Sequence, residues 1–187
     1  MKRRLFLLGA LAAGPLASCA PTPHANPLGR EARVALRIGR IEVRTEGAAF
    51  ESARARGYAG QLGPDLEAEL RRSFSDRLDP SGAALEVEIQ QVNLAGGTRT
   101  AFGSDQSRMT GAVRLLAEDG RLMASYPVTV IAGEARETTL GALAAATVSS
   151  AERFYRALLV DFARTTRSQM LGPDLPGARL LRQIGTG

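Results

Sequence analysis

Four segments of the chain alternate hydrophobic and polar residues, the period-two pattern of a half-buried β-strand. They span residues 33–44, 84–94, 109–117 and 121–132. In the first segment Val34, Leu36 and Ile38 share one face, and the phase then slips at Gly39, which indicates a β-bulge. The phase of the second segment slips at Gln90-Gln91. The pattern therefore predicts four strands.

Two other segments repeat their hydrophobic residues with the spacing of an amphipathic helix. The first is predicted over residues 62–78, where a leucine or phenylalanine recurs at every fourth position, and Pro64 suits its first turn. The second follows Ser149-Ser150-Ala151-Glu152, which fits a capping box. Its apolar face runs to about Leu171, and Gly172-Pro173 ends it.

The connecting segments carry turn signals of different strength. Asp119-Gly120 predicts a tight hairpin between the third and fourth strands. Pro127 lacks an N–H, so the fourth strand is expected at a sheet edge or broken there. Small and polar residues predict loops over 45–61 and 95–107, while 138–146 fits either a linker or a frayed helix.

The order β-α-β-β-β-α predicts an α+β domain with a mixed four-stranded sheet. The first β-α-β step favours a parallel pair, and the last three strands favour an antiparallel meander. Two helices then cover one face of the sheet. The other face carries Arg37, Glu42 and Arg44 on its first strand, which fits either a docking strip or a solvated surface.

The N-terminus has the layout of a secretory signal peptide. Lys2, Arg3 and Arg4 precede an uncharged run over residues 5–18 that ends in small residues. This run is shorter than the roughly 20 apolar residues that a membrane-spanning helix needs. We therefore expect residues 1–18 to be a cleaved signal peptide.

The end of that run holds the only cysteine of the chain, in the sequence Leu16-Ala17-Ser18-Cys19. These four residues resemble the lipobox of bacterial lipoproteins, in which a Leu, two small residues and a Cys are recognised. The resemblance implies that the Cys19 thiol is diacylated, that the chain is cut before it, and that the new amino group is usually acylated. More than one acyl chain is needed for stable membrane attachment. An ordinary signal peptide cut nearby is the alternative.

Residues 19–32 are predicted to form an extended tether, because prolines recur at positions 21, 23 and 27. In many lipoproteins an Asp after the lipidated Cys retains the protein in the inner membrane, whereas this chain has Ala20. The resemblance therefore implies an outer-membrane anchor that faces the periplasm. A single domain over residues 33–172 and a flexible tail over 173–187 complete the predicted organisation.

The charge of the mature chain does not favour nucleic acid as a partner. Removing Lys2, Arg3 and Arg4 from 24 basic residues leaves 21 against 19 acids, a net charge of about +2 rather than +5. The chain has no Trp, and Phe with Tyr make up only 5% of it. Nucleic-acid binding would require a clustered basic face and stacking aromatic side chains.

The residue inventory argues against most enzyme chemistry. The only His is His24, in the tether, and the only Cys is the anchor residue, so the domain lacks the residues of a Ser-His-Asp triad or of a usual zinc site. Glu86 and Glu88 share a strand face and form a weak carboxylate pair for hydrolysis. The segment 103–107 fits a turn better than a Ca2+ site, and Gly96-Gly97 lacks the setting of a nucleotide-binding loop. We expect no catalytic residues, metal or cofactor.

The lipobox, the proline-rich tether and the order of elements together resemble a loose class of small uncharacterised bacterial envelope lipoproteins. Assembly lipoproteins of lipopolysaccharide export and auxiliary lipoproteins of ABC-type lipid transporters are similar in outline. The sequence thus predicts a non-enzymatic lipoprotein that docks an envelope protein partner through the uncovered sheet face or the edge at Pro127. The alternative is binding of a lipid or apolar ligand in a groove between the 149–171 helix and the sheet.

Overall fold

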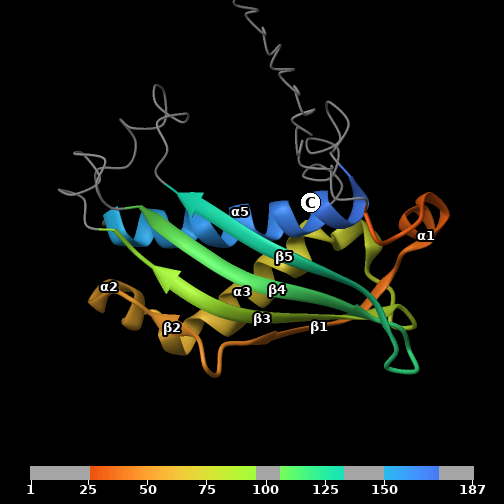
Figure 1. The fold of residues 1–187 in the computed structure, drawn as a ribbon, viewed down its shortest axis with the longest axis horizontal. Coiled ribbons are helices and arrows are strands. Elements are labelled where there is room, and N and C mark those ends of the chain that lie inside the picture. Colours follow the sequence, from red (N-terminus) through yellow and green to blue (C-terminus); the bar gives the residue numbers. More distant parts are fainter. Residues whose placement is uncertain (1–25, 96–105, 133–149, 173–187) are drawn as a thin grey trace, which may run out of the picture.

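The computed structural model describes residues 26–95, 106–132 and 150–172, which form an α+β fold with helices on one face of a mixed sheet (Figure 1). The strands are β1 Ile38–Arg44, β2 Ala49–Phe50, β3 Ala83–Asn93, β4 Ser107–Leu116 and β5 Leu122–Ala132. The helices are α1 Arg30–Ala35, α2 Ala53–Arg56, α3 Ala59–Ser73, the short 3-10 helix η1 Ser75–Arg77 and α5 Ser150–Leu171.

The sheet has the strand order β1-β3-β4-β5, with the short β2 also paired to β3. β1 is parallel to β3, whereas β3, β4 and β5 form an antiparallel meander, and both features confirm the predicted topology. The hairpin turn between β4 and β5 is closed by the Ala117 N–H, which donates to the Arg121 carbonyl at 2.9 Å. Gly120 in this turn has a φ of 81°, a conformation that favours glycine.

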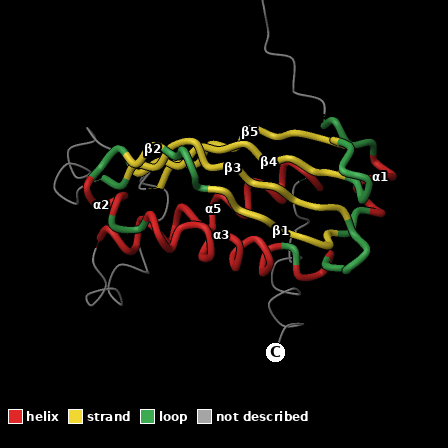
Figure 2. The backbone as a smooth tube through the Cα atoms, turned by 90° about the horizontal axis from the view of Figure 1, so that it is seen from below, coloured by secondary structure: helices red, strands yellow, loops and turns green. Residues whose placement is uncertain are grey.

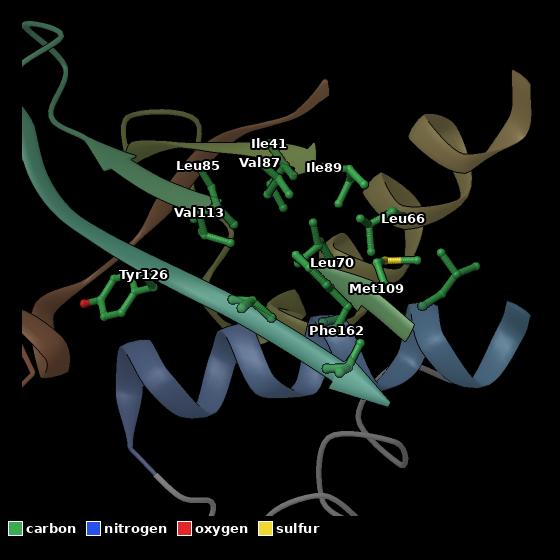
Figure 3. Packing of buried hydrophobic residues seen from close by; sticks show 14 of the residues in the cluster. Ile41, Leu66, Leu70, Leu85, Val87, Ile89, Met109, Val113, Tyr126 and Phe162 are labelled. Atoms are coloured by element: carbon green, nitrogen blue, oxygen red, sulfur yellow. The ribbon is translucent and has the colours of Figure 1, made fainter. Parts of the chain in front are cut away.

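Both long helices lie on the same face of the sheet, where they bury the hydrophobic core (Figure 2). Alternate residues of the central strands, such as Leu85 and Val87, point into this layer together with Leu66 and Leu70 of α3 and Phe162 of α5 (Figure 3). The completely buried side chains include Leu62, Leu66, Leu70, Phe74, Leu85, Val87, Met109, Val113, Leu115, Leu158 and Phe162. The predicted apolar stripes of both helices are therefore core.

The predicted strand over residues 33–44 is wrong in its first part. Residues 30–35 form helix α1, and Val34 is 65% exposed instead of sharing a buried face with Ile38. The parallel partner β3 begins at Ala83, which lies opposite Ile38, so the residues before Ile38 have no partner strand on that side. The helix-forming residues Ala32 and Ala35 suit a helical turn there.

The predicted loop over 45–61 and the predicted start of the first long helix are also wrong. The loop region contains β2, α2 and the first turn of α3, which begins at Ala59. Pro64 consequently lies inside α3, where it cannot donate to the carbonyl four residues earlier. That carbonyl belongs to Gly60, an exposed residue, and water can satisfy it. α3 ends at Ser73, so Leu78 lies beyond it and is exposed.

The other predicted irregularities and ends of elements agree with the structure wherever they fall on described residues. The β1–β3 register shifts between Ile38 and Arg40, and the β3–β4 register shifts between Ile89 and Gln91, where the phase slips were seen. α5 ends at Leu171 before Gly172, whose φ is 92°. The segments 138–146 and 173–187, most of 95–107, and Ser149 of the capping box lie outside the described residues.

The bulge in β1 requires a glycine. A Cβ atom on Gly39 would lie 2.7 Å from the Gly82 carbonyl oxygen and 2.8 Å from the Pro80 carbonyl oxygen. We expect Gly39→Ala to lower the free energy of unfolding by about 1–3 kcal/mol, because the backbone must move to admit the methyl group. Urea unfolding followed by circular dichroism measures this change.

The matched control for that substitution is Gly60→Ala in the first turn of α3. Gly60 has no atom within 4 Å of its added Cβ. The same methyl group should there raise the free energy of unfolding by about 0.4–1 kcal/mol, because alanine restricts the unfolded chain. Equal midpoints for Gly39→Ala and the wild type would show that the bulge tolerates a side chain.

Candidate functional site: the open face of the sheet

The face of the sheet opposite α3 and α5 has no helix packed on it among the described elements (Figure 2). We call it the open face. Strand alternation directs charged side chains onto it from β1, β3 and β4, and those near its centre are Glu42, Arg44, Glu86, Glu88 and Arg114. The register places Glu86 directly between Glu42 on β1 and Arg114 on β4.

These five side chains form one ion-pair network. The Arg44 Nε lies 2.8 Å from Glu42 Oε1, and its Nη2 lies 3.3 Å from Glu86 Oε1. The Arg114 Nη2 lies 3.3 Å from Glu88 Oε2 and 3.9 Å from Glu86 Oε2. The Glu86 side chain is only 14% exposed, because the two arginines flank it. The network therefore has a fixed centre at Glu86.

The arginines compensate a repulsion that the register creates. Glu42 and Glu86 are directly opposite each other, and like charges in this position destabilise a sheet. Arg44 contacts both carboxylates, and its hydrogen bond to Glu42 raises the pKa of the Arg44 guanidinium above its usual value. Exposed pairs of this kind contribute little to stability, because solvent screens the charges. The larger effect of the network is to hold these charges in a defined pattern on the sheet.

The open face becomes neutral toward β5. Small or uncharged residues lie here, namely Thr110 and Ala112 of β4 and Ser125, Pro127 and Thr129 of β5. β5 is an edge strand that continues past Pro127 without a break, so the edge prediction is confirmed. The Pro127 carbonyl accepts a hydrogen bond from Gln169 Nε2 of α5 at 3.1 Å. Part of this edge is thus covered.

The carboxylates considered for catalysis are engaged with arginines. Glu86 and Glu88 do share a face, but both belong to the ion-pair network. Two further carboxylates on α3 are also paired with arginines, Glu67 with Arg71 at 2.9 Å and Glu69 with Arg72. Within residues 26–95, 106–132 and 150–172 there is no group of three or more His, Cys, Asp or Glu residues placed to hold a metal ion.

The predicted ligand groove between α5 and the sheet coincides with closely packed core. Phe162 of α5 is completely buried, and a Cβ atom on Gly111 of β4 would lie 3.3 Å from its Cζ. The glycine at position 111 therefore lets the phenyl ring approach the sheet. Ligand binding in this layer stays a prediction that the packing does not favour.

Two polar contacts between helices were not predicted from the sequence. Arg167 of α5 is 6% exposed, and its Nη1 and Nη2 contact the two carboxylate oxygens of Asp76 at 2.8 and 2.9 Å. The Tyr155 hydroxyl donates to Asp65 Oδ2 at 2.8 Å, and its ring stacks on Tyr58. Burial and then this hydrogen bond raise the pKa of Tyr155. Both contacts fix α5 against the α3 region.

The predicted tether contributes residues to the folded domain. Asn26 Nδ2 donates to the carbonyls of Gln169 and Met170 at 2.6 and 3.1 Å, in the last turn of α5. Its Oδ1 accepts from the Leu28 N–H at 2.9 Å and from the Tyr126 hydroxyl at 3.0 Å. Burial raises the pKa of Tyr126 to about 12, so this donor stays protonated.

Leu28 is also part of the hydrophobic core, so the domain begins before the predicted boundary at residue 33. The hydrogen bond from the Leu28 N–H to Asn26 has a local sequence signal, because Asn side chains commonly hydrogen-bond the backbone two residues later.

The predicted lipidation residue Cys19, with Leu16, Ala17 and Ser18, lies outside the described residues. None of the described helices is long and apolar enough to cross a membrane.

Comparisons with known proteins identify only distant structural neighbours. No protein-family model and no curated protein matches the chain. One similar solved structure is of an uncharacterized protein, with 11% identity, a TM-score of 0.40, and coverage of 73% of this chain and 90% of that chain. Another is protein XCC0632 from Xanthomonas campestris, of family DUF330, with 15% identity, a TM-score of 0.33, and coverage of 82% and 85%.

Proposed function

We propose that this protein is a non-enzymatic lipoprotein, anchored by Cys19 in the outer membrane and facing the periplasm, that acts as an accessory component of an envelope assembly. The lipobox-like Leu16-Ala17-Ser18-Cys19 and Ala20 support the anchor and its membrane. The open face supports the docking role, and it is the observation on which the proposal mainly depends.

In an α+β domain the helices lie on one face of the sheet, and the other face is exposed to solvent or to a partner. Here the covered face holds the core, while the open face presents a fixed charge pattern around Glu86 next to the neutral surface of β4 and β5. A protein surface with the complementary charge pattern would be steered and oriented by such a pattern. The partner expected is therefore a polar periplasmic protein surface rather than an apolar ligand.

The test is a crosslinking pull-down in cells with a tag after Gly187, comparing the wild type with Arg114→Glu. Arg114 is partly exposed at the centre of the open face and contacts Glu86 and Glu88. The reversed charge adds a third carboxylate beside them, so we expect recovery of the docked protein to fall by about tenfold or more.

Arg71→Glu is the matched control. Arg71 is similarly exposed, but it lies on α3, on the opposite side of the sheet. This variant should recover the partner at the wild-type level. If Arg114→Glu and the wild type recover the same proteins in the same amounts, the open face is not the docking surface.

A further inference from the structure

The exposed large hydrophobic residues are concentrated at one end of the domain. Among the described residues four are exposed, and three of them are Val34 at 65%, Leu78 at 41% and Leu122 at 53%. Val34 belongs to α1, Leu78 is bridged to Ile38 at the start of β1, and Leu122 begins β5. Figure 1 shows that α1 and the β4–β5 turn lie at the same end of the sheet. We call this the tether end.

Each of these three residues directly follows an arginine, namely Arg33, Arg77 or Arg121. The Arg77 Nη1 donates to the Val34 carbonyl at 2.6 Å, so α1 and η1 are joined. Acidic residues are present here as well, including Asp79 and Asp119, so the tether end is nearly neutral rather than strongly basic. An apolar side chain beside an arginine suits the boundary between lipid headgroups and acyl chains.

The three hydrophobic residues are spread across the end instead of forming one pocket. β5 and β1 are opposite edges of the main sheet, with β3 and β4 between them. At the usual strand spacing, Leu122 and Leu78 are therefore separated by roughly 14 Å or more. Separate contacts at this spacing suit an extended plane better than the central cluster of a protein interface.

The chain itself limits how far this end can lie from the anchor. Asn26 is fixed to the end of α5 and to Tyr126, and α1 follows it four residues later. Asn26 lies seven positions after Cys19, and a fully extended chain of seven residue steps spans at most about 25 Å. A lipid on Cys19 thus keeps the tether end close to the membrane surface.

We infer that the tether end rests on the lipid surface, with Val34, Leu78 and Leu122 at the depth of the headgroups. This inference rests on the proposed lipid anchor and adds an orientation to it. The long axis of the sheet then points away from the membrane, and the ends of β3 and β5 at Asn93 and Ala132 face the periplasm.

The test uses the anchored protein with a single added thiol. If Cys19 is acylated, Val34→Cys provides the only free thiol of the mature chain, and it is labelled with an environment-sensitive fluorophore. The labelled protein is reconstituted in phosphatidylethanolamine and phosphatidylglycerol vesicles containing lipids brominated in the acyl chains. We expect bromine to quench the fluorescence of the label at residue 34 at least threefold more than that of a label at residue 160, which is the control. Leu122→Cys should behave like Val34→Cys.

Val160→Cys is the control, because Val160 is the fourth exposed hydrophobic residue. It lies on α5 eleven residues before Leu171, about 16 Å along the helix from its end. Flotation with the vesicles is measured first on every variant. Loss of flotation would overturn the lipid anchor and the orientation together. Flotation with equal quenching at residues 34, 122 and 160 would overturn the orientation alone.

Discussion

Cys19→Ser is expected to transfer the protein almost completely from the membrane fraction to the soluble periplasmic fraction. Under the proposed function the acyl chains on Cys19 supply the attachment. Each buried CH2 of such a chain contributes ~0.8 kcal/mol, and a second chain makes the attachment stable. The contacts proposed for the tether end are too few to replace this anchor.

The distribution is measured by immunoblotting of fractions after a high-salt and carbonate wash, with a tag after Gly187. His24→Ala, also within the predicted tether, is the control and should stay with the membrane. The mass of the mature wild-type protein should equal that of residues 19–187 and the tag, plus the acyl groups. A Cys19→Ser protein that resists the wash would contradict the lipoprotein assignment.

Phe162→Ala is expected to lower the free energy of unfolding by about 3–5 kcal/mol. The Phe162 ring is completely buried between α5 and the sheet, where Gly111 leaves space for it (Figure 3). Truncation removes the apolar surface of the ring and leaves a cavity that the rigid sheet cannot fill. Such a loss is a large part of the 5–15 kcal/mol that stabilises a typical domain.

Urea unfolding followed by circular dichroism measures this loss, since the chain has no Trp to report on the core. Val160→Ala is the matched control, because Val160 lies on the same helix and is exposed. That variant should change the free energy of unfolding by less than about 0.5 kcal/mol. A loss below about 1 kcal/mol for Phe162→Ala would mean that the packing of α5 on the sheet differs from the structure.

The sequence by itself determined the elements whose signals are local. Period-two alternation located β3, β4 and most of β1, and the phase slips at Gly39 and Gln90-Gln91 coincide with the register shifts. Leu62, Leu66, Leu70 and Phe74 share one side of the helix at successive turns, so their common face was visible without a structure. The residue inventory likewise argued against His- and Cys-based chemistry in the domain. The lipobox-like motif carries the proposed anchor in four consecutive residues.

Only the tertiary structure decided which charged residues meet. The ion pairs of Glu86 join three strands, and their partners follow from the register of β1 and β4 against β3, which no local pattern specifies. The same holds for Asn26 on the end of α5 and for Arg167 on Asp76, which are separated by more than 90 residues in sequence. Helix α1 replaced the start of a predicted strand because strand formation also depends on a partner, and β3 reaches no further than Ile38 on that side. Local periodicity thus determines the elements, whereas contacts between distant segments determine the open face and the tether end.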